Sequence, residues 1–248
     1  MEIQAFFERY PKVAVAFSGG VDSAFLLYLA KKHGAKARAY YVDTAFQPAF
    51  EKEDAQRFAE EIGASFRVIP VDILSCSEVL QNGADRCYHC KKRLFSALIR
   101  AAEEDGFSVL LDGTNASDDA ADRPGMRALK ELSVLSPLRI CGYTKDRIRD
   151  QSRKAGLFTW DKPAYACLAT RIRTGEAITG EKLQSTEKAE AFLFSLGFRD
   201  LRVRLVGRDA RIQVPVGEMQ RILEHREEIL SHLKKDYSGV FLDMEGRG

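Results

Sequence analysis

The chain has 248 residues, of which 45% are hydrophobic and 30% charged, enough for one large domain or a medium domain with a smaller one. Its 38 basic and 36 acidic side chains give a net charge of +2, which argues against a nucleic-acid partner. No apolar run approaches the ~18 residues of a membrane span, and the stretch MEIQAFFERYPK is unlike a signal or transit peptide. We therefore expect a cytoplasmic protein that binds neither membrane nor nucleic acid.

The first two thirds of the chain alternate between short β-rich runs and helical patterns. Strands are expected at 13–17, 37–43, 65–72 and 108–115. Helices are expected at 22–34, 49–63, 91–106 and 144–157, the last with Thr144 as its N-cap. This alternation predicts an α/β fold with a doubly wound parallel sheet, whose ligands bind at the carboxyl ends of the strands.

The pattern changes after residue 172. A helical segment at 175–198 precedes two alternating runs at 201–207 and 210–216 that read as a hairpin. A charged helix at 217–239 and a short strand at 240–246 complete the chain. We predict two domains, 1–172 and 173–248, the second a smaller α+β domain for substrate binding and oligomerisation in a homo-oligomer.

The stretch SGGVDS (18–23) joins the first expected strand to the first helix. Its glycines let backbone N–H groups approach phosphate oxygens, and the helix N-terminus adds partial positive charge. No lysine follows the glycines, so this is not a Walker loop. Asp22 is unusual beside an anion unless it caps the helix or helps to hold Mg²⁺.

This hexapeptide resembles the PP-loop of the N-type ATP pyrophosphatases, which have an adenine nucleotide alpha hydrolase-like fold. The resemblance implies cleavage of ATP between its α and β phosphates and adenylation of an acceptor, with Mg²⁺. We expect the ATP site to comprise Ser18, Gly19, Gly20, Asp22, Ser23, Asp43, Gly113 and Thr114. Asp118 and Asp119 follow the Gly113-Thr114-Asn115 turn and either hold Mg²⁺ or cap a helix.

Four further stretches narrow the resemblance. They are LDGTNASDDAADRPGMRAL (111–129), LSPLRICGYTKDRIR (135–149), WDKPAYACLATRI (160–172) and RVRLVGRDARIQV (202–214). Together with the loop they resemble the LarE family of ATP-dependent sulfur transferases, which serve nickel-pincer nucleotide synthesis for lactate racemase. The resemblance implies that a carboxylate of a pyridinium dicarboxylate mononucleotide is adenylated and that sulfur then displaces AMP.

The resemblance also implies an acceptor site. Arg202 and Arg204 have period-2 spacing, so both lie on one face of a strand, where two guanidinium groups suit a nucleotide phosphate or simply face water. Arg211 is a candidate third member across the hairpin. The other expected acceptor-binding residues are Arg123, Arg171 and Glu190.

Sulfur chemistry points to the cysteines. Cys167 matches the family's sulfur-donor cysteine, while Cys87 and Cys90 form a Cys-x-x-Cys at a helix start that favours thiolates. Three thiolates suit a [4Fe–4S] cluster with one iron open for sulfide, supplied as sulfide or by a cysteine desulfurase. A persulfide or redox pair, sacrifice of Cys167 and structural zinc are the alternatives. Cys76 and Cys141 are expected in core positions.

A tRNA-thiolating enzyme is the second reading, because it would use the same loop and the same cysteines. A chain of net charge +2 without a basic extension or an RNA-binding module argues against it. A nucleotide-binding protein without catalysis is a third reading, which would leave the three thiols unexplained.

Overall fold

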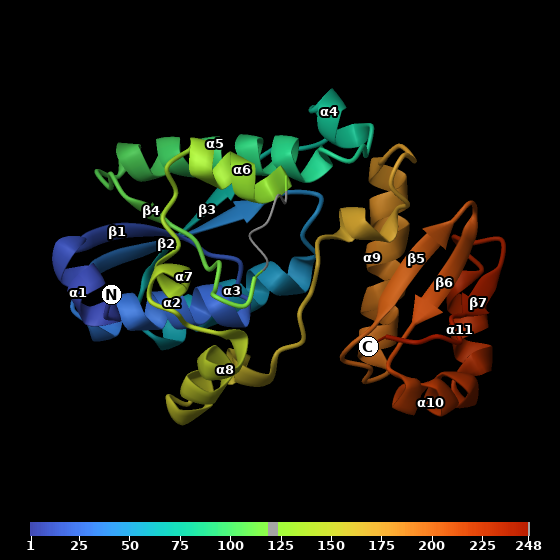
Figure 1. The fold of residues 1–248 in the computed structure, drawn as a ribbon. Coiled ribbons are helices and arrows are strands. Elements are labelled where there is room, and N and C mark those ends of the chain that lie inside the picture. Colours follow the sequence, from blue (N-terminus) through green and yellow to red (C-terminus); the bar gives the residue numbers. More distant parts are fainter. Residues whose placement is uncertain (119–123, 248) are drawn as a thin grey trace. The chain divides into compact units, whose positions relative to one another are not determined.

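The computed structural model describes residues 1–118 and 124–247 and divides the chain into two compact units (Figure 1). Unit 1 comprises Met1–Ile73 and Asp85–Tyr165, and unit 2 comprises Leu74–Ala84 and Ala166–Gly248. The segment Leu74–Ala84 therefore leaves unit 1 and belongs to the second unit, whereas the sequence analysis drew a single boundary after residue 172. Each helix in the described part of the chain is too short or too polar to cross a membrane.

Unit 1 is built on a parallel sheet of four strands in the order β3-β2-β1-β4. The strands are β1 (Lys12–Ala16), β2 (Lys36–Asp43), β3 (Ser65–Pro70) and β4 (Leu110–Leu111). Leu135 extends the sheet beyond β4 through a parallel bridge to Leu111. The predicted doubly wound parallel sheet is confirmed, and its order reverses between β1 and β4, where ligands of such sheets bind.

Helices cover both faces of this sheet (Figure 1). On one face lie α1 (Ile3–Arg9), α2 (Val21–Lys32), α3 (Ala49–Glu61), α7 (Pro137–Ile140) and α8 (Lys145–Lys154). On the other face lie α5 (Arg86–Glu104) and α6 (Pro124–Glu131). Successive strand residues point to opposite faces. Val13 and Val15 therefore join the core around α2, while Ala14 joins the core beneath α5.

Two local features of unit 1 bear on the site. Thr144 caps α8 as predicted, its hydroxyl accepting a hydrogen bond from the backbone N–H of Arg147 at 3.4 Å. Helix α5 begins at Arg86, five residues before the expected start, so Cys87 and Cys90 lie in its first turns. The short 3₁₀ helix η1 (Phe158–Asp161) follows α8.

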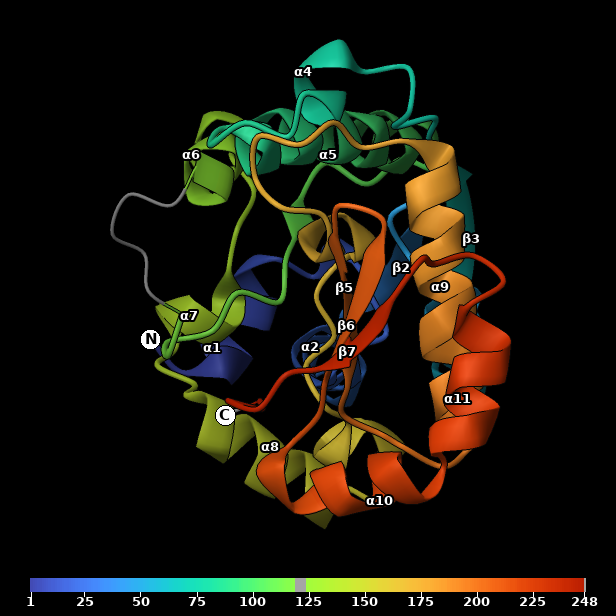
Figure 2. The same ribbon diagram turned by 90° about the vertical axis from the view of Figure 1, so that its right-hand side faces the viewer.

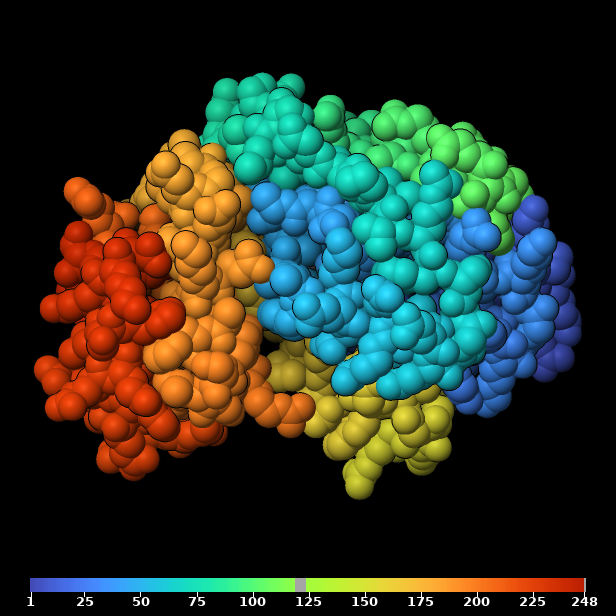
Figure 3. Space-filling model, turned by 180° about the vertical axis from the view of Figure 1, so that it is seen from behind, coloured from blue at the N-terminus to red at the C-terminus, as the bar shows by residue number. Residues whose placement is uncertain are grey.

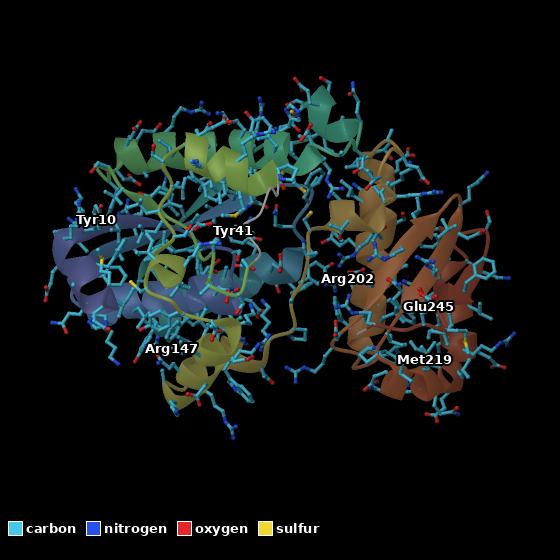
Figure 4. The ribbon with its side chains drawn as sticks, in the orientation of Figure 1. Tyr10, Tyr41, Arg147, Arg202, Met219 and Glu245 are labelled. Carbon is cyan, nitrogen blue, oxygen red and sulfur yellow. The ribbon has the colours of Figure 1, made fainter. Side chains whose placement is uncertain are left out.

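The interior of unit 1 and one of its outer surfaces are seen in two further views. Tyr41 of β2 is buried between the sheet and its helices (Figure 4). Seen from behind, light-blue to turquoise atoms of the segment with α3 and β3 cover the middle of this side of unit 1 (Figure 3).

Unit 2 has a three-stranded sheet in the order β5-β6-β7. The strands β5 (Arg202–Val206) and β6 (Asp209–Gln213) form the predicted antiparallel hairpin, and β7 (Val240–Leu242) is parallel to β6. The remaining elements are α4 (Ser77–Leu80), η2 (Leu168–Arg171), α9 (Gly180–Ser195), η3 (Val216–Glu218), α10 (Met219–Glu224) and α11 (Arg226–Leu233).

The expectation of one helix over 217–239 is wrong, because the chain turns at His225 between α10 and α11. Figure 2 shows the two helices running in different directions around the strands. Ile222 of α10 and Ile229 of α11 both pack in the core of unit 2.

The segment Leu74–Ala84 is fixed to unit 2 by Asn82. This residue is fully buried, has a φ of 55°, and donates from its side-chain amide to the carbonyls of Arg173 at 2.8 Å and Glu176 at 3.0 Å. Gly175 returns a backbone hydrogen bond to the Asn82 carbonyl at 2.8 Å. An asparagine in the left-handed region thus joins two distant parts of the chain.

Candidate active site

The phosphate loop, residues 18–23, connects β1 to α2 at the carboxyl edge of the sheet. Its two serines close it: the Ser18 N–H donates to Ser23 Oγ at 3.2 Å, and Ser23 Oγ donates to the Gly20 carbonyl at 3.2 Å. Gly20 is the N-cap of α2, with no side-chain cap. The first N–H groups of α2 therefore have no side-chain cap and suit an anion.

Two glycines are required by the space around the loop. Gly19 has a φ of 72°, and a Cβ there would lie 3.1 Å from the Ala55 Cβ of α3. A Cβ on Gly113, which follows β4, would lie 2.9 Å from the backbone nitrogen of Ser23. A side chain at Gly19 would therefore press on α3, and one at Gly113 would press on the first turn of α2.

Asp22 of the loop pairs with a lysine from α8. Its Oδ2 lies 2.6 Å from Lys145 Nζ, and both side chains are partly buried. Its Oδ1 is buried and has no hydrogen-bond partner among the described residues. A buried carboxylate oxygen without a partner beside a phosphate loop suits a Mg²⁺ ligand.

A second lysine reaches the loop from the segment after η1. Lys162 Nζ lies 2.7 Å from the Asp54 carboxylate and 3.4 Å from the Gly19 carbonyl, which accepts its hydrogen bond. Lys145 and Lys162 were not singled out from the sequence. The signal was present, because the loop has no lysine of its own and each lysine lies in a stretch that resembles the family.

The other expected residues of the ATP site lie at neighbouring strand ends. Asp43 ends β2 and pairs with Lys52 at 2.5 Å. Thr114 donates its hydroxyl hydrogen to the buried Asp112 carboxylate, which also accepts from Ser136 Oγ at 2.6 Å. Thr114 therefore anchors the turn after β4.

Of the two carboxylates expected to hold Mg²⁺ or to cap a helix, the structure describes only Asp118. Asp118 Oδ2 accepts the backbone N–H of Asn115 at 2.9 Å and so closes a turn. Asp119 and the acceptor candidate Arg123 lie outside the described residues. No group of three His, Cys, Asp or Glu side chains suited to a metal ion is found among residues 1–118 and 124–247.

The cysteines are divided between the units. Cys87, which is exposed, and Cys90, which is partly exposed, belong to unit 1, while Cys167 belongs to unit 2. The Arg86 guanidinium lies 3.6 Å from Cys87 Sγ.

Of the two cysteines expected in core positions, one matches. Cys141 packs against the unit 1 core, where burial raises the pKa of its thiol. Cys76 instead lies partly exposed at the N-cap of α4, with Sγ 3.4 Å from the Glu78 carboxylate. It differs from the expectation because α4 is a single short turn whose buried residue is Val79.

Beside Cys167, a buried ion pair organises unit 2. Arg171 and Glu190 are about 1% exposed, and they form two bonds, Nε to Oε1 at 2.7 Å and the terminal nitrogen to Oε2 at 2.9 Å. The other terminal nitrogen of Arg171 donates to the Ala166 carbonyl at 2.8 Å. Glu190 also accepts the backbone N–H of Val203 at 2.8 Å, so it links α9, η2 and β5.

Arg202 and Arg204 extend from one face of β5. Arg202 is 6% exposed and its guanidinium donates to the Leu201 carbonyl at 2.8 Å (Figure 4). Arg204 donates from Nε to Gln213 at 2.5 Å and from a terminal nitrogen to the Thr170 carbonyl at 2.8 Å. This second contact joins the hairpin to the segment that carries Cys167.

A parallel sheet with a glycine loop at its switch point and lysines beside the loop defines a nucleotide-using protein of the PP-loop class. Comparison with known families agrees, because residues 1–139 match the PP-loop domain. A tRNA-specific 2-thiouridylase of Clostridium botulinum is 29% identical over 60% of this chain and 52% of its own length.

Two relatives match nearly the whole chain. An uncharacterised protein of Synechocystis sp. is 34% identical over 98% of this chain and 92% of its own length. The pyridinium-3,5-bisthiocarboxylic acid mononucleotide synthase of Lactiplantibacillus plantarum is 30% identical over 95% of this chain and 86% of its own length. The chain belongs to the LarE family, within the PP-loop superfamily.

Proposed function

We propose that the chain is an ATP-dependent sulfur transferase that acts on pyridinium-3,5-biscarboxylic acid mononucleotide. It adenylates a carboxylate of this nucleotide and replaces the bound AMP by sulfur, which gives a thiocarboxylate. The phosphate loop carries the proposal, because its required glycines and uncapped helix N-terminus suit the pyrophosphate that adenylation releases. The name of the Lactiplantibacillus relative gives a bisthiocarboxylic acid mononucleotide as its product, from which we infer the corresponding dicarboxylate as the acceptor.

The first step makes the carboxylate reactive. A carboxylate oxygen attacks the α-phosphorus of ATP, the bond from that phosphorus to the bridging oxygen breaks, and pyrophosphate leaves. The N–H groups of the loop and of α2 donate hydrogen bonds that stabilise the negative charge developing on the leaving pyrophosphate. Lys162, which contacts the Gly19 carbonyl, is held beside the loop by its ion pair with Asp54.

Asp22 suits a Mg²⁺ ion at this step, because its Oδ1 is buried and without a partner among the described residues. When bound, Mg²⁺ neutralises phosphate charge, and it takes its remaining ligands from ATP and water, as Mg²⁺ commonly does. Lys145 holds the other oxygen of Asp22 and so fixes the orientation of the carboxylate.

In the second step a sulfur nucleophile attacks the carbonyl carbon of the adenylate. The carbon–sulfur bond forms, the bond from carbon to the AMP oxygen breaks, and AMP leaves. With hydrosulfide as nucleophile, the proton on sulfur is lost to solvent and the product is the thiocarboxylate anion. Neither step changes an oxidation state, so no oxidant or reductant is needed.

For the sulfur source we propose Cys87, Cys90 and Cys167 as ligands of a [4Fe–4S] cluster. The donor set supports the proposal, because it provides three thiols that are all at least partly exposed. Held by these three cysteines, such a cluster would supply an exchangeable sulfide for the second step. The sulfide comes from solution or from a cysteine desulfurase.

Product analysis tests the proposed reaction. With ATP, Mg²⁺, sulfide and the dicarboxylate nucleotide, we expect equal amounts of AMP and pyrophosphate, and a product in which one oxygen is replaced by sulfur by mass spectrometry. Omitting the acceptor should leave pyrophosphate release at background. Formation of ADP and orthophosphate would contradict the assignment, and turnover with tRNA in place of the nucleotide would favour the thiolation of tRNA.

The sulfur source is tested separately. Protein isolated without oxygen should contain about four irons per chain. Alanine at Cys87, Cys90 or Cys167 should remove the iron and repeated turnover, whereas Cys76→Ala and Cys141→Ala should do neither. Conversion of Cys167 to dehydroalanine, once per product formed, would establish the sacrificial route instead. Light scattering during gel filtration tests the expected homo-oligomer.

A further inference from the structure

The segment 160–162 of unit 1 carries Lys162 to the phosphate loop. Its backbone N–H groups are used locally, because Trp160 donates to the Leu157 carbonyl at 3.1 Å and Lys162 donates to the Thr159 carbonyl at 3.2 Å. These bonds belong to the turn of η1 and leave the carbonyls of Trp160 and Lys162 for donors elsewhere in the fold.

Both carbonyls are bound by Arg149 of α8. One terminal nitrogen of its guanidinium donates to the Trp160 carbonyl at 2.6 Å, and the other donates to the Lys162 carbonyl at 2.9 Å. The planar guanidinium holds its nitrogens at a fixed spacing, so it sets the positions of two carbonyls at once, which the point charge of a lysine does not do. Arg149 therefore fixes the backbone from which the Lys162 side chain extends.

The Lys162 side chain ends between α3 and the phosphate loop. It is 14% exposed, and its Nζ lies 2.7 Å from the Asp54 carboxylate of α3. The same Nζ donates a hydrogen bond to the Gly19 carbonyl at 3.4 Å. Because Asp54 balances its charge, the contribution of Lys162 in this arrangement is a donor aimed at the Gly19 carbonyl.

The Gly19 carbonyl belongs to a peptide group between two glycines, where the loop has most conformational freedom. Because this peptide is trans, its C=O and N–H point in opposite directions. Holding the carbonyl on Lys162 therefore holds the Gly20 N–H on the other side, where it lies 3.4 Å from Ser18 Oγ. A rotation of this peptide would exchange the two groups and weaken an anion site built from N–H donors.

We propose that Arg149 is a positioning residue of the phosphate loop, which it orients through Lys162 and the Gly19 carbonyl. The contacts run from the guanidinium to the backbone of segment 160–162, and then along the Lys162 side chain to the loop. All of these residues belong to unit 1. The inference rests on the proposed function only in assigning the loop to the phosphates of ATP.

Calorimetry with ATP and Mg²⁺, in the absence of the acceptor, tests this role. Arg149→Gln removes the fork and should weaken ATP binding about tenfold, the loss expected for one hydrogen bond. Arg149→Lys keeps the charge but does not bridge the two carbonyls, so it should bind at an intermediate level. Arg153→Gln is the matched control, because it removes the same charge from α8, and the Arg153 guanidinium lies over the Trp160 ring at 5.1 Å instead of on the backbone. This control should bind ATP as the native chain does.

A double-mutant cycle separates positioning from a general loss of stability or of charge. Lys162→Met should weaken ATP binding by itself. In that background Arg149→Gln should have no further effect on ATP affinity, because the group that it positions is absent. Losses of stability or of charge would instead multiply in the double variant. Circular dichroism checks that Arg149→Gln is folded, and Arg149→Lys takes its place in the cycle if it is not.

The outcomes for this role and for the proposed function are distinct. Native ATP affinity in Arg149→Gln, equal losses in Arg149→Gln and Arg153→Gln, or multiplied effects in the double variant would overturn the inference even if the thiocarboxylate is formed. A protein that obeys the cycle and forms no thiocarboxylate would overturn the proposed function and leave this role of Arg149 standing.

Discussion

The two candidate anion sites are built in opposite ways. In unit 1 the phosphate loop offers backbone N–H groups, and the lysines beside it are paired, Lys145 with Asp22 and Lys162 with Asp54. In unit 2 the candidate acceptor site offers guanidinium side chains, of which Arg171, Arg211 and Arg247 pair with carboxylates. A backbone site binds an anion through N–H groups and a helix N-terminus, whereas a side-chain site binds it through charged groups.

This difference predicts the largest effect at Gly19. Gly19→Val should abolish ATP binding measured by calorimetry, because the site requires a φ of 72° and a Cβ would lie 3.1 Å from Ala55. Gly20→Ala is the matched control: a Cβ there meets only Ser18 Oγ, at 3.4 Å, so ATP binding should be largely retained. Retained binding in Gly19→Val would show that the loop is not a backbone site.

The next largest effect concerns the stability of unit 2. Glu190→Ala leaves the Arg171 guanidinium buried without its partner, which should lower the free energy of unfolding by about 3–5 kcal/mol in urea denaturation. The double variant Arg171→Met, Glu190→Leu should recover most of this loss. A single variant as stable as the native chain would mean that water reaches the pair.

A smaller effect is expected for the acceptor. Arg202→Gln and Arg204→Gln should each weaken binding of the dicarboxylate nucleotide by about 1.5–3 kcal/mol, one charge-assisted contact, while ATP affinity stays the same. Arg208→Gln serves as control, because Arg208 is an exposed arginine of the hairpin turn. If both variants bind the acceptor normally, the acceptor does not use the hairpin.

The smallest expected effect is a pH dependence in the stability of unit 1, which arises from Asp105. Hydrogen bonds from Arg67, Arg38 and Tyr40 lower the pKa of Asp105 from its ordinary value of 3.8 to about 2. A lowered acid pKa stabilises the fold above the unfolded value, so the stabilisation of unit 1 is lost as the pH falls from about 4 to 2. Asp105→Asn should melt earlier at pH 7 and depend less on pH between 4 and 2. An unchanged pH profile would show that the hydrogen bonds to Asp105 contribute nothing to the stability of unit 1.

The sequence predicted the parts of the molecule whose signals are local. The phosphate loop, the parallel sheet, the hairpin and the Thr144 cap each depend on neighbouring residues, and they are found where expected. The last strand of the sheet is shorter than expected, Leu110–Leu111 instead of 108–115. The polar residues that follow this strand form side-chain hydrogen bonds in place of sheet hydrogen bonds, as Thr114 does with Asp112.

What the sequence did not predict depends on contacts between distant residues. Lys145 lies 123 positions from its partner Asp22, and Lys162 lies 108 positions from Asp54. Arg247 meets Asp200 across the whole hairpin and two helices. Lysine and arginine in polar stretches normally indicate solvated surface, so only the fold reveals which of them are assembled.

The excursion of Leu74–Ala84 into unit 2 has a consequence for synthesis on the ribosome. The first eleven residues of unit 2 emerge before α5 and the rest of unit 1, yet the carbonyls that Asn82 binds belong to Arg173 and Glu176. About ninety residues must therefore be translated before this buried amide finds its acceptors. Until residues 166–248 have been made, the segment Leu74–Ala84 has no partner surface and stays exposed to proteases.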